Sequence, residues 1–202
     1  MLGKTHTAVG VGAALLILQP ATLPELLAGT AAAVIGSTIS DIDASRSGSH
    51  KEVNRVIAVT GTAVVGVALL DTLFHTGIAQ KIMNHANLAR VVVALLAFVG
   101  ICVFGERQPL RSFMHSLLAG ILLTAVLGSI LPGAAPYFAL AFASHLVLDS
   151  LNYKKVRFLY PMKNGFCLKI CPADGLGNRI LFGVGSVAAL GGILLSFVRV
   201  IS

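Results

Sequence analysis

The stretch 88-LARVVVALLAFVGICVF-104 is apolar from end to end apart from Arg90. A run of this length predicts a helix that crosses a bilayer, because about 20 apolar residues span a hydrocarbon core of about 30 Å. Similar apolar blocks occur near Ala8–Leu18, Leu26–Ile39, Val56–Phe74, Phe113–Leu131, Tyr137–Leu151 and Ile180–Val200. The sequence therefore predicts an all-α fold, a polytopic membrane bundle of about seven helices. The first two blocks are short, so they are tilted, extended by flanking residues, or a re-entrant pair.

Composition supports a single membrane-embedded domain over residues 1–202. Hydrophobic residues make up 56% of the 202 residues and charged residues 11%, against about 25% in soluble domains. The longest stretch without an apolar block is 152–179, which we expect to be a cytoplasmic loop or lid. Its two cysteines, Cys167 and Cys171, do not have a common zinc-knuckle spacing and are expected to be reduced thiols, with a disulfide or structural zinc as the alternative.

The basic residues are distributed unevenly between the two ends of the predicted helices. The net charge is +7, but no aromatic and basic stripe accompanies it, so nucleic acid is not an expected partner. The end that holds the N-terminus carries twelve of the 15 Lys and Arg residues, and the other end carries Lys81, Arg90 and Arg199. Since short cytoplasmic loops are enriched in Lys and Arg, we predict a multi-pass inner-membrane protein with its N-terminus in the cytoplasm.

Six residues that can bind metal fall at this same end. His6 begins the first predicted helix, Asp41 and Asp43 end the second, and His115 lies in the first turn of the fifth. The sixth predicted helix ends with His145 and Asp149. These last two residues are one helical turn apart and so project from one face. Antiparallel threading brings all six to one membrane depth. Acidic residues are costly near apolar segments, so placing three there indicates a function.

Imidazole with carboxylate suits zinc, manganese or iron. Six ligands exceed one tetrahedral shell, so we expect one or two divalent ions, and two ions about 3.5 to 4 Å apart would use all six residues. Taken singly, each residue has a simpler explanation as an interfacial or helix-end polar group. We expect Asp71, His75 and His85, at the opposite end, to be interfacial.

The basic residues around this cluster suggest a phosphate ester as substrate, because guanidinium and ammonium groups bind phosphate oxygens. Asp43 or Asp41 could bridge ions or act as general base, and Arg111 would neutralise charge that develops on the phosphoryl group. Further substrate contacts are expected from Lys154, Arg157, Lys163 and Arg179. Positive-inside topology and anionic lipid headgroups would place the same charges there without any catalytic role.

Four short motifs carry a family resemblance: Gly3-Lys4-Thr5-His6, Ser40-Asp41-Ile42-Asp43, the segment from Arg111 to Leu118, and the segment from Ser144 to Asn152 with Leu159-Tyr160-Pro161 after it. Together they resemble the YdjM family of inner-membrane proteins, regarded as metal-dependent hydrolases. The family is distantly similar to the all-helical zinc phospholipase C and P1 nuclease group. The resemblance implies phosphoester hydrolysis, with metal roles for His6, Asp41, Asp43, His115, His145 and Asp149.

The chain departs from the family pattern at Leu110, where a histidine is usual, and at Ser112 and Met114. His50 could substitute for the missing histidine; otherwise this member holds fewer metals, acts on another substrate or has lost activity. The leading hypothesis is a membrane-bound metal-dependent hydrolase of a lipid or lipid-linked phosphate ester. The alternatives are a metal or ion transporter, and a non-catalytic membrane protein with a structural metal. Oligomeric state and substrate identity cannot be obtained from the sequence.

Overall fold

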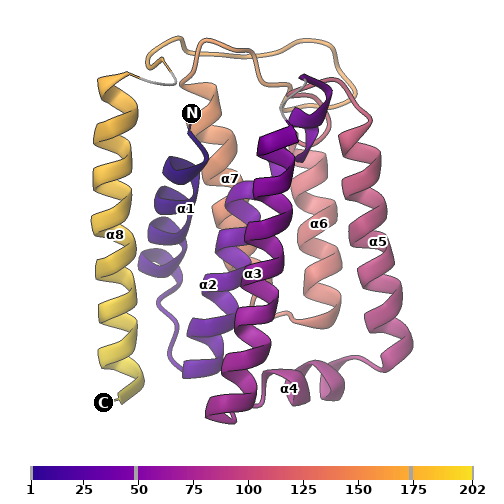
Figure 1. Cartoon of the computed structure of the whole chain (residues 1–202), viewed down its shortest axis with the longest axis vertical. Coiled ribbons are helices and arrows are strands. Elements are labelled where there is room, and N and C mark those ends of the chain that lie inside the picture. The colour runs from indigo at the N-terminus through magenta and orange to yellow at the C-terminus, as the bar shows by residue number, and fades with distance from the viewer. Residues whose placement is uncertain (1, 48–49, 173–174, 202) are drawn as a thin grey trace.

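The computed structural model of the chain describes residues 2–47, 50–172 and 175–201, and the side chains of residues 44–53 lie outside this description. The described chain is a helical bundle (Figure 1). Its elements in order are α1 (Gly3–Leu18), α2 (Leu23–Thr38), the 3-10 helix η1 (Ile39–Ser47), α3 (His50–Phe74), α4 (Ile78–His85), α5 (Leu88–Glu106), α6 (Leu117–Ile130), α7 (Ala135–Ser150) and α8 (Leu176–Ile201). The predicted all-α bundle is confirmed, and each of the seven expected segments contains a helix.

Within the described ranges, four helices are long and apolar enough to cross a membrane: Leu23–Asp43, Asn54–Phe74, Leu88–Glu106 and Leu176–Ile201. The first of these joins α2 to η1, so the second apolar block is lengthened by the residues that follow it. α1 and α6 are shorter apolar helices. The outer surfaces of α3, α5 and α8 expose large apolar side chains, as expected of surfaces that face lipid.

The sequence did not predict α4, which lies across the end of the bundle opposite the N-terminus (Figure 1). Eight residues with a lysine among them are too short and too polar to be read as a span. Asp71, at the end of α3, accepts hydrogen bonds from the backbone N–H groups of Ile78 (2.8 Å) and Ala79 (2.9 Å). This carboxylate therefore caps α4, which is a more specific role than the interfacial one expected of it.

Close helix contacts at two glycines bring α1, α2 and α7 together at the centre of the bundle. A Cβ atom on Gly36 of α2 would lie 2.5 Å from the carbonyl oxygen of Phe138 in α7. A Cβ atom on Gly10 of α1 would lie 2.8 Å from Cβ of Ser37. Small residues allow such an approach where lipid provides no hydrophobic drive between helices. The consequence is that His6 of α1, the end of α2 and the last turns of α7 lie close together.

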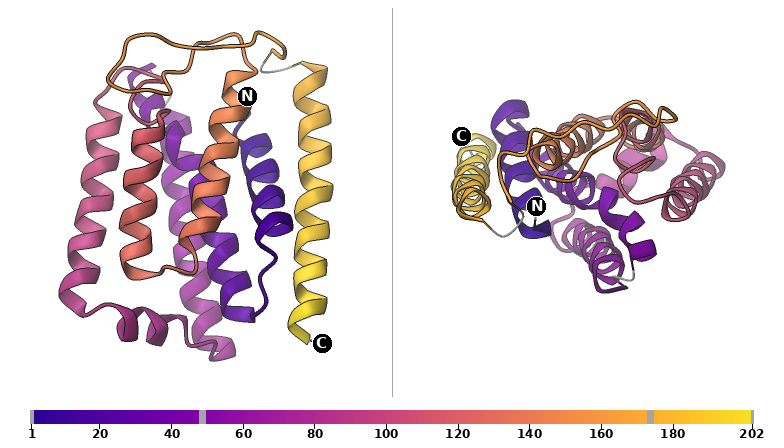
Figure 2. Two further views of the ribbon diagram at one scale, coloured as in Figure 1. Left: turned by 180° about the vertical axis from the view of Figure 1, so that it is seen from behind. Right: turned by 90° about the horizontal axis from the view of Figure 1, so that it is seen from above.

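The segment between α7 and α8 crosses the end of the bundle where the N-terminus lies (Figure 2). Val156 and Phe166 form an isolated antiparallel bridge within it. The N–H group of Leu168 donates to the carbonyl of Ser150 (2.7 Å), and that of Leu117 donates to the carbonyl of Phe158 (3.0 Å). The expected loop ends earlier than residue 179, because α8 begins at Leu176. Cys167 and Cys171 are free thiols.

Candidate metal centre

The structure brings all six predicted metal-binding residues to one end of the bundle. His6 lies in the first turn of α1, and His145 and Asp149 lie in the last two turns of α7. Asp41 and Asp43 belong to η1 rather than to the end of an α-helix. The prediction that His115 lies in the first turn of a helix is wrong: α6 begins at Leu117, because the hydroxyl of Ser116 caps it by accepting the N–H of Ala119.

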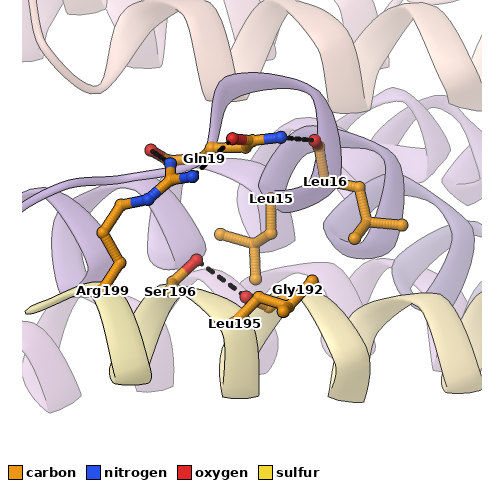
Figure 3. Close-up of a pocket in the computed structure, with 7 residues that line it drawn as sticks. All are labelled: Leu15, Leu16, Gln19, Gly192, Leu195, Ser196 and Arg199. Atoms are coloured by element: carbon orange, nitrogen blue, oxygen red, sulfur yellow. Dashed lines mark hydrogen bonds between the residues drawn. The ribbon is translucent and has the colours of Figure 1, made fainter.

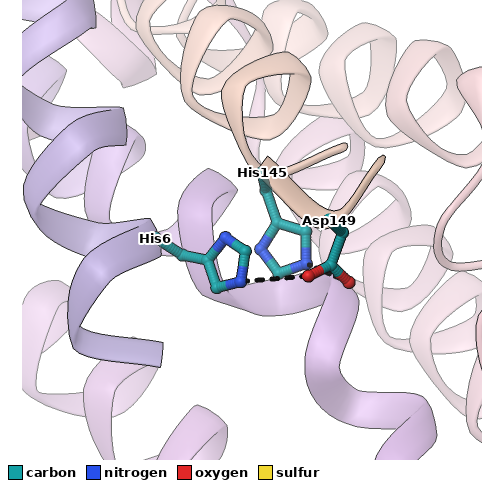
Figure 4. Close-up of side chains that lie close together, drawn as sticks. All are labelled: His6, His145 and Asp149. Carbon is teal, nitrogen blue, oxygen red and sulfur yellow. Dashed lines mark ion pairs between the residues drawn. The ribbon is translucent and has the colours of Figure 1, made fainter. Parts of the chain in front are cut away.

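His6, His145 and Asp149 form the first group of possible ligands (Figure 4). Nε2 of His6 lies 3.3 Å from Oδ1 of Asp149. The imidazole rings of His6 and His145 stack, with their centroids 3.9 Å apart. Nε2 of His145 lies 3.9 Å from Oδ2 of Asp149, one turn further along α7. All three side chains are buried.

Asp41, His115 and His145 form the second group, which shares His145 with the first. Nε2 of His115 lies 3.4 Å from Nε2 of His145 and 3.3 Å from Oδ2 of Asp149. Oδ1 of Asp41 lies 3.7 Å from Nε2 of His145 and 3.9 Å from Nε2 of His115. Ligand atoms around a tetrahedral zinc ion, with bonds of about 2.0 to 2.1 Å, are about 3.3 Å apart. The spacing of these nitrogen and oxygen atoms therefore suits ligands of a shared cation.

Hydrogen bonds from the opposite ring nitrogens fix two of the histidines. Nδ1 of His145 lies 2.7 Å from the carbonyl oxygen of Ser37, and Nδ1 of His115 lies 3.1 Å from Oδ2 of Asp43. A carbonyl or a carboxylate only accepts, so Nδ1 carries a proton in both rings, and Nε2 of each ring faces the centre. The sequence does not single out Ser37, because this residue acts through its backbone carbonyl, which no side-chain pattern reveals.

Asp43 contacts the Nδ1 side of His115, whereas the sequence predicts that this carboxylate is a metal ligand or general base. Its Oδ2 accepts hydrogen bonds both from His115 and from the backbone N–H of Arg111 (2.9 Å). Its Oδ1 is buried and has no hydrogen-bond partner among the described residues. These contacts put the carboxylate on the Nδ1 side of the ring, away from the Nε2 atom that meets the other ligands.

Arg111 joins the site to the segment that covers it. Its Nη2 lies 3.1 Å from Oδ2 of Asp149, and its Nη1 donates to the carbonyl of Lys154 (3.4 Å). Its backbone φ of 58° is left-handed, an uncommon conformation for a residue other than glycine. Arg111 thus contacts the carboxylate of a possible ligand directly.

The charges of the site favour a bound cation. Burial by itself lowers the pKa of His115, since it disfavours the imidazolium ion, but Asp43 and then Asp149 outweigh burial and raise this pKa to about 10. Asp41 is 29% exposed and is the most accessible of the six side chains, whereas Asp43 and Asp149 are buried. Buried carboxylates with imidazole nitrogens are a donor set for divalent metals, and the residues present fit such an ion.

The predicted substrate-binding residues differ in their distance from this centre. Arg157 is partly buried, and its N–H donates to the carbonyl of Arg111 (3.3 Å). Lys154 is exposed and contributes its carbonyl to Arg111. Lys163 and Arg179 are exposed, and within the described part of the chain no hydrogen bond or ion pair joins them to the six residues. The side chain of His50, the suggested substitute for the missing histidine, lies outside the described residues.

A small pocket of about 100 Å³ lies between α1 and α8, at the opposite end of α1 from His6 (Figure 3). The guanidinium of Arg199 donates there to the carbonyl oxygen (3.2 Å) and side-chain oxygen (2.8 Å) of Gln19. Its remaining lining is mostly apolar. This pocket is separate from the histidine and aspartate cluster.

Comparison with known proteins gives one match. No curated protein and no solved structure matches the chain. The family model described as YdjM inner membrane protein matches residues 1–201. Because the match covers nearly the whole sequence, and because the structure is an apolar helical bundle with several candidate spans, the chain belongs to the YdjM family of inner membrane proteins.

Proposed function

We propose that the protein is a membrane-bound, metal-dependent hydrolase that cleaves a phosphate ester of a lipid or lipid-linked substrate at the cytoplasmic face. The observation that carries this proposal is the convergence of three imidazoles and two carboxylates at one end of an apolar bundle. Burying ionisable side chains next to a membrane costs free energy, so such a cluster indicates a function. Its position at the end of the bundle favours a substrate with a buried tail and an exposed headgroup.

His6, Asp41, His115, His145 and Asp149 would hold the ion, and Asp43 would orient His115. A single ion is favoured because both groups of ligands share His145. Nδ1 of this ring already donates to the carbonyl of Ser37, so only Nε2 remains for a metal. Zinc is the first choice by donor type, and manganese and iron are also compatible with imidazole and carboxylate.

A divalent ion held in such a site would lower the pKa of a bound water to about 7. Asp41 is the most accessible carboxylate, and its oxygen that does not hold the ion would take the proton from an attacking water. Arg111 and Arg157 would neutralise charge that develops on the phosphoryl oxygens, and Lys154 would bind at the same edge. Lys163 and Arg179 would contact lipid headgroups further out.

The cytoplasmic orientation rests on the distribution of charge. Lys81 of α4, Arg90 of α5 and Arg199 of α8 lie at the end opposite the candidate metal centre. The other twelve Lys and Arg residues lie in the terminal turns of helices, or in the segments between helices, at the end where the centre lies. Under the positive-inside rule the second end faces the cytoplasm. Thiol labelling of Lys81→Cys and of Lys163→Cys, each in a chain whose Cys102, Cys167 and Cys171 are replaced by serine, tests this orientation in intact and in permeabilised cells.

The experiment for the proposed activity uses the full chain in lipid nanodiscs. We expect about one bound zinc per chain by elemental analysis, and release of phosphate or headgroup from phosphatidic acid, phosphatidylglycerol or a polyprenyl diphosphate, detected by mass spectrometry. His145→Ala should lose both the metal and the product, whereas Asp71→Asn, at the other end of the bundle, should lose neither. Protein that binds no stoichiometric metal, or that releases no product from any of these lipids when zinc is present, would overturn the proposal.

The same measurements separate the two alternatives. A transporter would move metal into proteoliposomes, and His145→Ala would abolish this uptake. Transporters generally place ionisable residues near mid-membrane on interrupted helices, whereas this cluster lies at the helix ends. A structural metal predicts that Asp149→Ala lowers thermal stability and metal content in a protein that has no turnover to lose.

A further inference from the structure

A groove of about 410 Å³ runs between α6 and α7 on the outside of the bundle. Among the described residues that line it, Thr124 alone carries a polar side-chain atom. Small residues contribute to the hollow on both helices: Gly120 and Ala125 on α6, and Ala139 and Ala143 on α7. Ala125 and Ala143 are exposed, so the groove opens towards the lipid.

The groove is somewhat shorter than the depth of one leaflet. It follows α6 from Leu117 to Ala125 and α7 from Ala139 to Leu146. At 1.5 Å per residue these stretches are about 10 to 12 Å long, compared with about 15 Å for half of the hydrocarbon core. A chain in the groove would therefore stay within the leaflet next to the candidate metal centre.

One end of the groove lies next to residues of that centre in the sequence. Leu117 follows His115 by two residues, and Leu146 directly follows His145. The segment of Arg157 also passes this end, because the N–H of Arg157 donates to the carbonyl of Arg111 and the carbonyl of Phe158 accepts the N–H of Leu117. A segment that carries a cationic residue thus passes the end of the groove that is nearest to His115 in the sequence.

We infer that this groove binds one acyl chain of the phospholipid whose phosphate is presented to the candidate metal centre. This inference rests on the proposed function and names how its substrate enters, which is sideways from the adjacent leaflet. The volume favours an acyl chain over a helix from a second copy of the protein. A helix is about 10 to 12 Å across, and its cylinder over the same length would occupy roughly two to three times the volume of the groove.

Photolabelling in nanodiscs tests the inference with phosphatidic acid that carries a diazirine in one acyl chain. We expect adducts, mapped by mass spectrometry, to concentrate in residues 117–125 and 139–146. Ala125→Phe and Ala143→Phe fill the groove from its lipid side and should reduce this labelling several-fold. Ala68→Phe is the matched control, because Ala68 is an exposed alanine on the candidate span Asn54–Phe74. It should leave labelling in the groove unchanged.

Adducts spread evenly over the lipid-facing helices would overturn the inference, as would unchanged labelling in Ala143→Phe. Crosslinks from α6 and α7 to a second copy would overturn it too, since the groove would then be an interface. The test is independent of metal: His145→Ala should lose the ion and keep the labelling. Bound metal without labelling in the groove would remove only this inference, whereas labelling without metal or turnover would remove only the hydrolase proposal.

Discussion

Nδ1 of His115 lies 3.1 Å from Oδ2 of Asp43, and both side chains are buried. The two residues are 72 positions apart, one in η1 and the other just before α6. The contact directs Nε2 of His115 towards His145 and Asp149. The contact makes Asp43 a positioning residue for the proposed metal site. The sequence alone does not distinguish this role from that of a metal ligand, because an aspartate can fill either.

Asp43→Ala should weaken metal binding without abolishing it. Loss of a carboxylate that orients a metal-bound histidine reduces affinity by about 10- to 100-fold. Titration of the purified protein against a competing zinc chelator measures this change. Asp71→Ala, which removes a carboxylate at the opposite end of the bundle, should leave the affinity as it is. Complete loss of bound zinc in Asp43→Ala, equal to that in His145→Ala, would show that Asp43 is itself a ligand.

The pKa of His115 predicts that zinc binding releases a proton. In the metal-free protein Asp43 and Asp149 raise this pKa from 6.5 to about 10, so the ring is protonated at pH 8. A metal ion must displace that proton, so affinity should increase with pH until about pH 10. The same shift stabilises the metal-free fold fully below pH 6.5, and this stabilisation is lost as the pH rises through about 10.

Calorimetric titration at pH 8, in two buffers with different ionisation enthalpies, measures the number of protons released. About one proton per zinc is expected. His115→Gln removes the titrating group and should remove this release, although it will also weaken binding. If the heat of zinc binding to the unsubstituted protein is the same in both buffers, no proton is released. This result would contradict the prediction that His115 is protonated before zinc binds.

Gly36→Ala should disturb the metal site although residue 36 binds nothing. Its Cβ would lie 2.5 Å from the carbonyl oxygen of Phe138, so α2 and α7 would have to move apart. Overpacking of this kind costs about 1 to 3 kcal/mol of unfolding free energy. The movement would also separate the Ser37 carbonyl from His145, and zinc affinity should fall. Thermal unfolding and chelator competition measure the two effects.

The matched control is Gly66→Ala on α3, where the added Cβ would meet nothing within 4 Å. Alanine is the better helix former, so this variant should be as stable as the parent protein or slightly more stable. Equal behaviour of the two variants would show that the contact between α2 and α7 at Gly36 does not hold the site together.

The sequence was sufficient to predict the seven apolar segments and the end at which the six residues meet. Both follow from bilayer thickness and antiparallel threading, which depend only on the length and order of apolar blocks. It was not sufficient to predict helix ends, because capping groups such as Ser116 and Asp71 decide them locally. The different roles of Asp41 and Asp43 also depend on the 3-10 geometry of η1 and on the backbone of Arg111, which residue type does not specify.

Arg111→Gln should destabilise the metal-free protein more than the zinc-loaded protein. The guanidinium lies 3.1 Å from Oδ2 of Asp149, whose side chain is 1% exposed. Removing the cation from a buried ion pair costs about 3 kcal/mol, because the charge that remains is less well compensated. A zinc ion bound to Asp149 would supply that compensation. Glutamine keeps a Cβ at the same left-handed backbone position, so backbone strain is similar in both proteins. Thermal unfolding with and without zinc measures the difference, and an equal loss of stability in the two states would place the metal away from Asp149.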